Sequence, residues 1–125
     1  MKFQPETLNG GFVVHAYDDT GIVLNGQRYA HSLMFGESLP PIQWHSSASN
    51  GLSVADAQWI LAQCPPSMEV LLLGTGPTQV FPALDIRRFF INQRCPIEYM
   101  DSQAAARTYN ILMGEGRHVV AALLL

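Results

Sequence analysis

Two different patterns of hydrophobic residues divide the chain into an N-terminal and a C-terminal half. Up to residue 44, short apolar runs rich in β-branched residues alternate with turn residues, and this alternation predicts β-strands. The dipeptide Asn25-Gly26 is typical of a type I′ β-hairpin, because both central residues of that turn take positive φ. A proline-rich connection is expected at 36–41. The predicted strands are 12–17, 22–24, 28–35 and 42–44.

From residue 52 onward, apolar residues recur every three or four positions, which predicts helices. Ser53 is a suitable N-cap for the first helix, which should end near Cys64 because Pro65-Pro66 cannot continue it. A second helix is predicted over 83–94. The third should begin after a cap at Asp101 or Ser102 and reach residue 113, with Gly114 as its C′ residue. The strands predicted between and after these helices are 69–73, 97–100 and 118–125.

These three helix–strand units predict an α/β fold. Residues 71–73 and 119–124 are apolar at every position, as is typical of strands that are buried on both faces. Strands of this kind that are joined through helices pair in parallel by right-handed crossovers. We therefore expect residues 1–125 to form a single α/β domain, with a mixed sheet, helices on its faces and an antiparallel hairpin region from the N-terminal half.

The composition narrows the class of protein further. With 125 residues, 48% of them hydrophobic and 14% charged, the chain is too apolar for a disordered protein, and its two cysteines exclude a disulfide-stapled miniprotein. Seven basic and ten acidic residues give a net charge of −3, so we expect no nucleic-acid partner.

No segment suggests a membrane span or a secretory signal. The longest apolar run, 119–125, is far shorter than the roughly 20 residues that cross a bilayer, and residues 1–6 are polar. We therefore expect a cytoplasmic protein in which Cys64 and Cys95 are reduced. Both thiols precede proline at a helix C-terminus, where the helix dipole disfavours the thiolate, so neither is expected to be redox-active.

The best candidate for a binding site is the loop that begins Gly74-Thr75-Gly76-Pro77-Thr78. It follows a buried strand, and ligands of α/β sheets collect where such strands end. The loop does not match the dinucleotide fingerprint, because Gln79 stands where the third glycine belongs. Two interpretations stay open: a tight turn that needs positive φ, or a turn that also holds a small ligand or anion.

The next strand should bring Asp101-Ser102 to the same edge of the sheet. The hydroxyl groups of Thr75, Thr78 and Ser102 are then expected to line any pocket there. Arg117 begins the final strand, so we expect it at the opposite edge with a mainly structural role.

A cluster of cations and aromatic residues lies within the second predicted helix. Three of the seven basic residues lie here: Arg87, Arg88 and Arg94. Two interpretations stay open: these arginines contact an anion or a partner, or they form a solvated helix face. One helix face cannot bury all of 89–91, Phe-Phe-Ile, so one of these residues is a candidate for an interface.

No arrangement of residues points to catalysis, to a cofactor or to a metal. The cysteines form no CxxC, no serine stands in a Gly-x-Ser-x-Gly elbow, and the adjacent Asp18 and Asp19 fit a turn better than an acid–base pair. The histidines have no metal-ligand spacing. The four histidines are His15, His31, His45 and His118, and the serines considered as nucleophiles are Ser46, Ser47 and Ser49.

Three segments carry a resemblance to a known family. They are 71–76 (Leu-Leu-Leu-Gly-Thr-Gly), 101–105 (Asp-Ser with Ala105) and 108–117, in which Thr108-Tyr109-Asn110 is followed by Glu115-Gly116-Arg117. In this order they resemble the Mth-type family of domains of unknown function, which includes a mitochondrial complex I assembly factor and an adipogenesis-associated protein. Ser102 stands where many members have threonine.

The resemblance implies a compact three-layer α/β domain without an established activity or cofactor. Because the assembly factor works by binding other proteins, our first hypothesis is a non-catalytic protein-binding or assembly module, either a monomer or a weak homodimer. The rival hypothesis is a small-ligand-binding protein or uncharacterised enzyme that uses the loop from Gly74 to Thr78, with Tyr109, Asn110 and Arg117.

Overall fold

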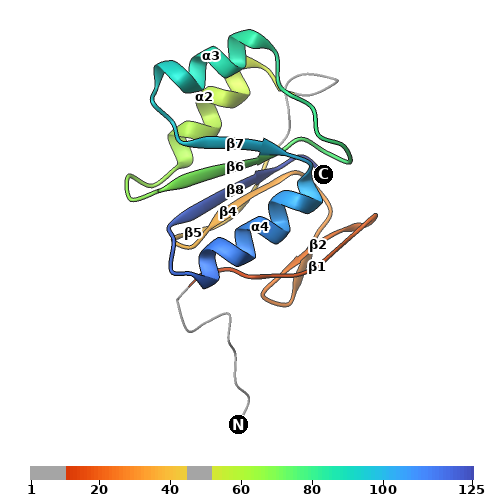
Figure 1. Ribbon diagram of the computed structural model, residues 1–125. Coiled ribbons are helices and arrows are strands. Elements are labelled where there is room, and N and C mark those ends of the chain that lie inside the picture. Colours follow the sequence, from red (N-terminus) through yellow and green to blue (C-terminus); the bar gives the residue numbers. More distant parts are fainter. Residues whose placement is uncertain (1–10, 45–51) are drawn as a thin grey trace.

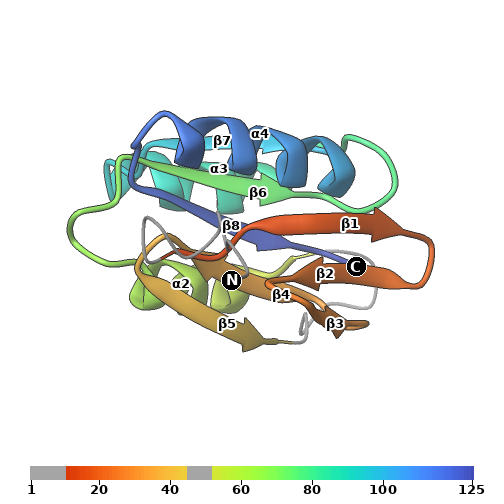
Figure 2. The same ribbon diagram turned by 90° about the horizontal axis from the view of Figure 1, so that it is seen from below.

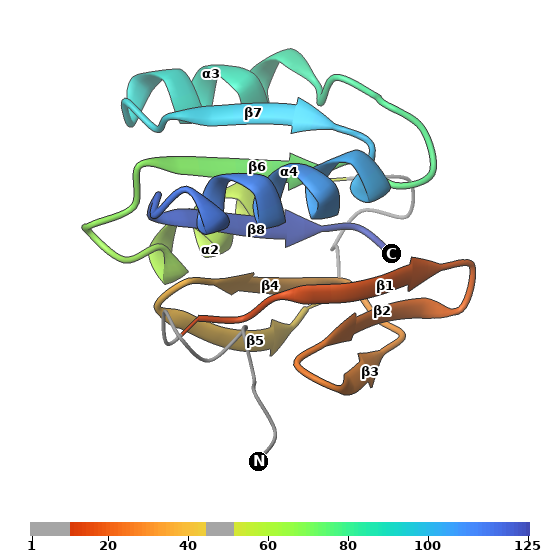
Figure 3. The same ribbon diagram turned by 60° about the horizontal axis from the view of Figure 1, so that its bottom comes forward.

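A five-stranded mixed sheet forms the middle layer of the structure, a computed structural model that describes residues 11–44 and 52–125 (Figure 1). Its strand order is β5-β4-β8-β6-β7, which can be followed across the sheet in Figure 3. Strands β8, β6 and β7 are parallel, whereas β4 is antiparallel to both β8 and β5. The strands are β4 (Leu33–Gly36), β5 (Leu39–Gln43), β6 (Val70–Gly74), β7 (Ile97–Met100) and β8 (Val119–Leu123).

Helices cover both faces of this sheet. The chain passes from β6 through α3 outward to β7, and then through α4 back across the sheet to β8. Because both crossovers are right-handed and run in opposite directions, α3 and α4 lie on opposite faces of the sheet. Leu71 and Leu73 of β6 therefore pack with α2 and α3, while Val70 and Leu72 pack with α4. The helices are α2 (Val54–Gln63), α3 (Leu84–Asn92) and α4 (Ser102–Gly114).

A second, three-stranded antiparallel sheet shares the α4 face of the molecule (Figure 2). Its strands are β1 (Val14–Asp18), β2 (Gly21–Leu24) and β3 (Gln27–Tyr29). The predicted hairpin is confirmed, since Asn25 has φ 46° and Gly26 has φ 88°. Ile22 and Leu24 are buried in the same core cluster as α4. The α/β class, the mixed sheet and the N-terminal hairpin region all agree with the sequence prediction.

Two details of the N-terminal half differ from the prediction. The expected strand 28–35 is wrong, because β3 ends at Tyr29 and the chain passes into the large sheet before β4 begins at Leu33. The expected connection over 36–41 is also wrong, because β5 contains Pro40 and Pro41. Both prolines are tolerated there because β5 is an edge strand and because its pairing with β4 is irregular between Leu39 and Ile42.

The helix ends follow local capping chemistry. Ser53 and Asp56 form a capping box at the start of α2, which ends at Cys64 as predicted. Asp101 is the N-cap of α4, and its Oδ1 accepts a hydrogen bond from the backbone N–H of Ala104 at 2.8 Å.

The prediction of Gly114 as the C′ residue of α4 is wrong. Gly114 is still helical, and Gly116, with φ 82°, follows the C-cap residue Glu115. The N–H of Gly116 donates to the carbonyl of Met113, and the N–H of Arg117 donates to that of Leu112. This pair of bonds is a Schellman motif.

Within the described ranges, no helix combines the length and the apolar character that crossing a membrane requires.

Candidate functional site

The carboxyl ends of the three parallel strands meet at one edge of the large sheet, as the sequence predicts for β6 and β7. Three segments follow these ends: the loop 75–83 after β6, Asp101 and Ser102 after β7, and 124–125 after β8. The turn between β1 and β2 reaches the same edge. A cavity of about 390 Å³ opens at this edge and is lined by Tyr17, Asp18, Asp19, Thr20, Gly21, Ala30, Gly76, Pro77, Gln103, Leu124 and Leu125.

Gly74 is required at this edge by close packing rather than by its backbone conformation. A Cβ atom added to it would lie 2.8 Å from the Cα of Ser102 and 2.7 Å from a methyl group of Leu123. Its φ is not positive, whereas Gly76 has φ 102° with open space around the Cβ position. The positive φ expected of this loop therefore belongs to Gly76, and Gly74 allows α4 to approach β6.

Ser102 joins the ends of all three parallel strands. Its hydroxyl accepts a hydrogen bond from the N–H of Gly76 at 2.9 Å and donates to the carbonyl of Leu124 at 2.6 Å. Its own N–H donates to the carbonyl of Gly76 at 2.8 Å. Ser102 is fully buried and, contrary to the prediction, lines neither the large cavity nor the smaller one beside Thr75.

Thr75 stabilises the conformation of the loop after β6 through hydrogen bonds. Its hydroxyl donates to the carbonyl of Thr78 at 2.8 Å and accepts from the N–H of Val80 at 3.0 Å, while the N–H of Thr75 donates to the carbonyl of Met100. Thr78 itself is exposed. Thr75 lines a second cavity of about 300 Å³, whose other lining residues are Leu52, Val80, Phe81, Pro82, Ala83 and Leu124.

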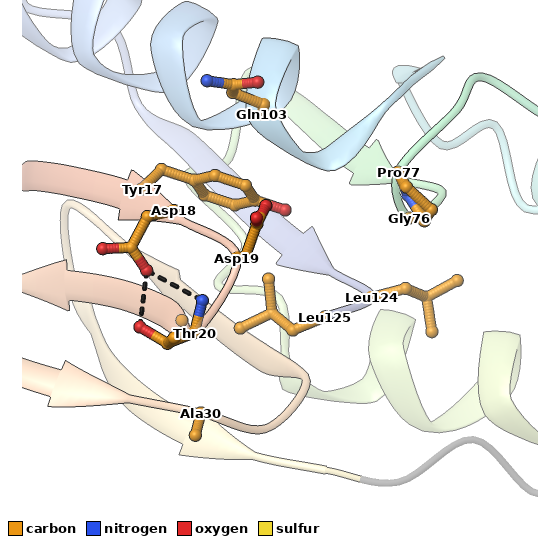
Figure 4. Close-up of a pocket in the computed structure, with 11 residues that line it drawn as sticks. Tyr17, Asp18, Asp19, Thr20, Ala30, Gly76, Pro77, Gln103, Leu124 and Leu125 are labelled. Atoms are coloured by element: carbon orange, nitrogen blue, oxygen red, sulfur yellow. Dashed lines mark hydrogen bonds between the residues drawn. The ribbon is translucent and has the colours of Figure 1, made fainter.

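The polar groups that face the larger cavity come from segments that the sequence analysis did not connect with the loop. Figure 4 shows the ring of Tyr17 beside the carboxylate of Asp19, with Gln103 above on α4 and Leu124 and Leu125 on the far side. Burial raises the pKa of the Tyr17 phenol above its usual value, and the hydroxyl of Ser102 partly offsets this effect. Tyr17 precedes the loop by almost sixty positions, so only the β1–β2 turn prediction could have hinted at it.

Asp18, the last residue of β1, is held by residues of the adjoining turn and of β3. Its carboxylate accepts hydrogen bonds from both the N–H and the hydroxyl of Thr20 and forms an ion pair with Arg28 at 3.2 Å. These hydrogen bonds, that of Arg28 above all, lower the pKa of Asp18 well below its usual range. Asp18 thus stabilises the turn that the sequence predicts, although the residue itself ends β1.

Two residues of the family segment dock the small sheet onto α4. The buried hydroxyl of Tyr109 donates to the carbonyl of Phe12 at 2.5 Å, and its ring packs edge-on against Phe35. Asn110 binds both backbone groups of Val14: its Oδ1 accepts from the N–H at 2.9 Å and its Nδ2 donates to the carbonyl at 2.7 Å. Burial raises the pKa of Tyr109 beyond that of a free phenol. Both side chains are engaged in holding the fold.

The rest of that segment lies toward the other end of α4. The Nε of Arg117 lies 3.6 Å from Oε1 of Glu69, which also accepts a hydrogen bond from the N–H of His118 at 2.8 Å. Arg117 thus lies at the amino ends of β6 and β8, on the edge opposite Gly74 where we expected it. Thr108 is half-buried, and Glu115 and Gly116 are exposed. The loop from Gly74 to Thr78 and Arg117 are therefore not brought together.

Candidate ligands for a metal do not gather in the part of the chain that the structure describes: there, no three His, Cys, Asp or Glu residues form a group that could hold a metal ion. His118 pairs with Glu37 at 2.9 Å, and this pairing raises its pKa. Burial raises the pKa of the free thiols of Cys64 and Cys95, to about 12 and about 11. The candidates His45, Ser46, Ser47 and Ser49 lie outside the described residues.

The aromatic and basic cluster of the sequence lies on α3 and in the two residues that follow it. Phe90 is fully buried and Phe89 is half-buried, whereas Ile91 has 71% of its surface exposed. Arg88 and Arg94 are exposed, and the guanidinium Nε of Arg87 donates to the carbonyl of Pro82 at 2.9 Å. Ile91 is thus the residue of the run 89–91 that the core does not absorb.

Comparison with known proteins identifies relatives along almost the whole chain. The family described as protein of unknown function (DUF498/DUF598) matches residues 14–124. A Francisella tularensis subsp. holarctica protein described as "13 kDa major membrane protein" is 27% identical over 121 residues, covering 95% of each chain. NADH dehydrogenase (ubiquinone) 1 alpha subcomplex assembly factor 3 of Danio rerio is 28% identical over 99% of this chain and 70% of its own length.

Solved structures show the same fold. A crystal structure of a Bordetella parapertussis protein superposes with a TM-score of 0.77 at 38% identity, covering 91% of this chain and 95% of that one. A solution NMR structure of a Bordetella pertussis protein, described as a Mth938-like domain, has a TM-score of 0.72 at 32% identity, covering 99% and 90%. These matches confirm the resemblance to the Mth-type family.

Proposed function

The chain belongs to the DUF498/DUF598 family, and from this premise we propose that it is a single-domain, non-catalytic module that binds another protein and assists its assembly. The family includes a protein named as an assembly factor, so a role in assembly is compatible with membership. The proposal that this chain binds a protein rests on which of its polar groups are hydrogen-bonded and which of its apolar side chains are exposed.

The observation that carries the proposal is the contrast between the candidate site and the segment beside it. At the strand ends, the hydroxyls of Ser102 and Thr75 are both engaged in hydrogen bonds that hold the loop. Next to them, Val80 and Phe81 expose 55% and 63% of their surface. Adjacent apolar side chains in water favour burial against a partner, and they do not supply the acid, base or nucleophile that a reaction needs.

We further propose that the partner is a protein rather than nucleic acid, and that the module acts in the cytoplasm as a monomer or a weak homodimer. The net charge of −3 disfavours a polyanion as partner. The free thiols of Cys64 and Cys95 suit a reducing compartment.

Affinity capture tests this function. The tagged chain, produced in its own host at native level, should co-purify with one reproducible protein that is absent from captures with an unrelated tagged protein of similar size. The identified partner should also bind the purified chain directly in isothermal titration calorimetry. Failure to recover a partner, together with turnover of a compound in a metabolite screen, would contradict the proposal.

A second candidate function, small-molecule binding, is favoured by the larger cavity. Its volume of about 390 Å³ lies within the usual range for ligand pockets, and the side chains of Tyr17, Asp19 and Gln103 supply polar contacts. This cavity uses Gly76 and Pro77 of the predicted loop, but not Ser102. A thermal-shift screen against a metabolite library tests it: a true ligand should stabilise the wild type and the variant Arg107→Ala, but should stabilise Gln103→Ala much less. Equal shifts in all three proteins would exclude this cavity as the site.

A further inference from the structure

Helix α3 is apolar on two opposite faces, although only one of them is packed. Ile86 and Phe90 face the sheet, with 2% and 0% of their surface exposed. Leu84 and Ile91 expose 50% and 71%. With 3.6 residues per turn, Leu84, Arg88 and Ile91 follow the spacing i, i+4, i+7 and form one outward line, called here the α3 stripe. A helix that only covers a sheet needs no second apolar face.

Exposed apolar residues are concentrated in the part of the sequence that contains this stripe. The described part of the chain contains six large hydrophobic residues that are classed as exposed, and four of them lie between positions 80 and 91. Figure 1 shows α3 on the outer side of the sheet, above β7, with the loop 75–83 leading into it. The four residues are Val80, Phe81, Leu84 and Ile91. Scattered exposure would need no explanation, but concentration in one segment indicates an interaction surface.

The net charge of the segment that carries the stripe differs in sign from that of the whole chain. Residues 84–94 contain three arginines and one aspartate, which gives 3 − 1 = +2, whereas the whole chain has a net charge of −3. Arg88 stands within the stripe, between Leu84 and Ile91. A ligand for this surface must therefore bury apolar groups and carry negative charge.

We propose that the α3 stripe is the docking surface for an acidic amphipathic helix of a partner protein. Apolar residues of the partner helix would pack on Leu84 and Ile91, and its carboxylates would flank them to pair with Arg88 and Arg94. This inference rests on the proposed function, because it names the surface and the partner chemistry of the same protein-binding role.

A second copy of this chain fits the stripe less well. Pairing of two stripes about a two-fold axis brings each residue close to its own counterpart or to a neighbour of it. Arg88 stands in the middle of the stripe, Arg87 lies on the same helix, and Arg94 follows its C-cap. Such a pair would therefore bring like charges together, which disfavours association.

Addition of a partner strand to the neighbouring edge of the sheet is also less favourable. Backbone bonds to β6 use the carbonyls of Pro96 and Met100, so the backbone groups of Tyr99 point toward the free edge of β7. The amide Nε2 of Gln79 already donates to the Tyr99 carbonyl at 3.1 Å. An added strand would first have to displace this side chain, whereas a helix on the α3 stripe would displace no contact among the residues that the structure describes.

Matched substitutions on α3 and α4 test the proposal with the partner identified by affinity capture. Ile91→Ser and Arg88→Glu alter the stripe, while Ile111→Ser and Arg107→Glu make the same exchanges at exposed positions of α4. All four side chains are exposed, so all four variants should keep the Tm of the wild type within a few degrees. Each stripe variant should weaken the Kd for the partner by about tenfold or more, and each α4 variant by less than about twofold.

The remaining outcomes separate the surface from the function. If the partner binds all four variants equally, the stripe is not the surface, although the protein-binding function stands. If the wild type captures no partner, the function itself fails, and the inference fails with it. Binding that is lost in Arg88→Glu but restored by a Glu→Arg change in the partner helix would support the proposal. Arg88-dependent flotation with phosphatidylglycerol vesicles, without a protein partner, would overturn it in favour of a membrane surface.

Discussion

The helices α3 and α4 lie on opposite faces of one sheet and differ in how completely they are covered. α4 lies against the large sheet and is also docked to the small sheet, where Tyr109 and Asn110 bind the backbone of residues 12 and 14. α3 buries Ile86 and Phe90 against the large sheet and leaves Ile91 in solvent. Both helices thus have two partners, since α3 also packs beside α2, but α3 keeps an exposed apolar face.

This difference separates the segments that carry the family resemblance from the surface that we propose for binding. Residues 108–110 belong to α4, and the side chains of Tyr109 and Asn110 act within the molecule. The α3 stripe contributes to none of the three segments that carry the resemblance. A motif that identifies a family therefore need not mark the surface that binds a partner, and here it describes how the small sheet is held in place.

The largest loss of stability is expected from Gly74→Ala, because Gly74 of β6 lies in close contact with Ser102, the first residue of α4. The new methyl group would lie within 2.8 Å of the backbone of Ser102, so α4 would have to shift, at a cost of about 3 kcal/mol in the free energy of unfolding. Urea denaturation measures this loss. Unchanged stability would show that Ser102 and β6 are not in close contact.

A smaller loss, of about 2 kcal/mol, is expected for Asn110→Ala, because both backbone groups of Val14 lose their side-chain partner. Hydrogen exchange should then accelerate mainly in β1 to β3, while β6 and β8 remain protected. Ile111→Ala, at the next position on the exposed side of α4, is the control and should change stability by less than about 0.5 kcal/mol. Uniform acceleration over both sheets would contradict a docking role for Asn110.

The end of α4 allows a prediction in which two glycines respond with opposite signs. Gly116→Ala should destabilise the protein by about 1 kcal/mol, because alanine does not readily adopt φ 82°. Gly114→Ala should be neutral or stabilise it by up to about 1 kcal/mol, since this position is helical and an added Cβ meets nothing within 4 Å. Thermal unfolding of both variants checks the pair, and equal losses would argue against the Schellman ending.

The inner side of α3 can be tested through the two thiols, with the smallest expected effect on the fold. Burial raises the pKa of Cys64 to about 12 and that of Cys95 to about 11, which leaves very little thiolate at neutral pH. Alkylation by iodoacetamide at pH 7 should therefore be at least about tenfold slower than that of a cysteine introduced by Ile111→Cys. Mass spectrometry measures both rates, and equally fast modification would mean that the packing under α3 opens readily.

Local signals along the chain predicted most of the fold, because caps and turns act over a few residues. The Asn25-Gly26 hairpin, the cap at Ser53 and the end of α2 at Cys64 are all local effects. The break after Tyr29 was missed, because the predicted strand 28–35 runs across the polar pair His31-Ser32, which separates Tyr29 from the apolar residues of β4. Gly114 and Gly116 differ only in which of them takes positive φ, a choice set by the hydrogen bonds at the helix end.

The surroundings of the candidate loop depend on contacts that no local pattern reveals. Tyr17 and Gln103 meet Gly76 only because the β1–β2 turn and α4 both reach one edge of the sheet. Ser102 lies at the expected edge, but its buried hydroxyl is hydrogen-bonded to the backbone of Gly76 and Leu124 and does not line a pocket. The exposed line of Leu84, Arg88 and Ile91 was available from their spacing; burial of Ile86 and Phe90 shows that it faces outward.

Hydrogen exchange of the complex with the captured partner measures the contrast between the two helices most directly. We predict that amides of α3 and of the adjoining residues 80–83 become more protected on binding, while those of α4 and of β1 to β3 keep the exchange rates of the free protein. Protection confined to α4, or to the cavity beside Tyr17 and Gln103, would contradict the assignment of the bare α3 face as the binding surface.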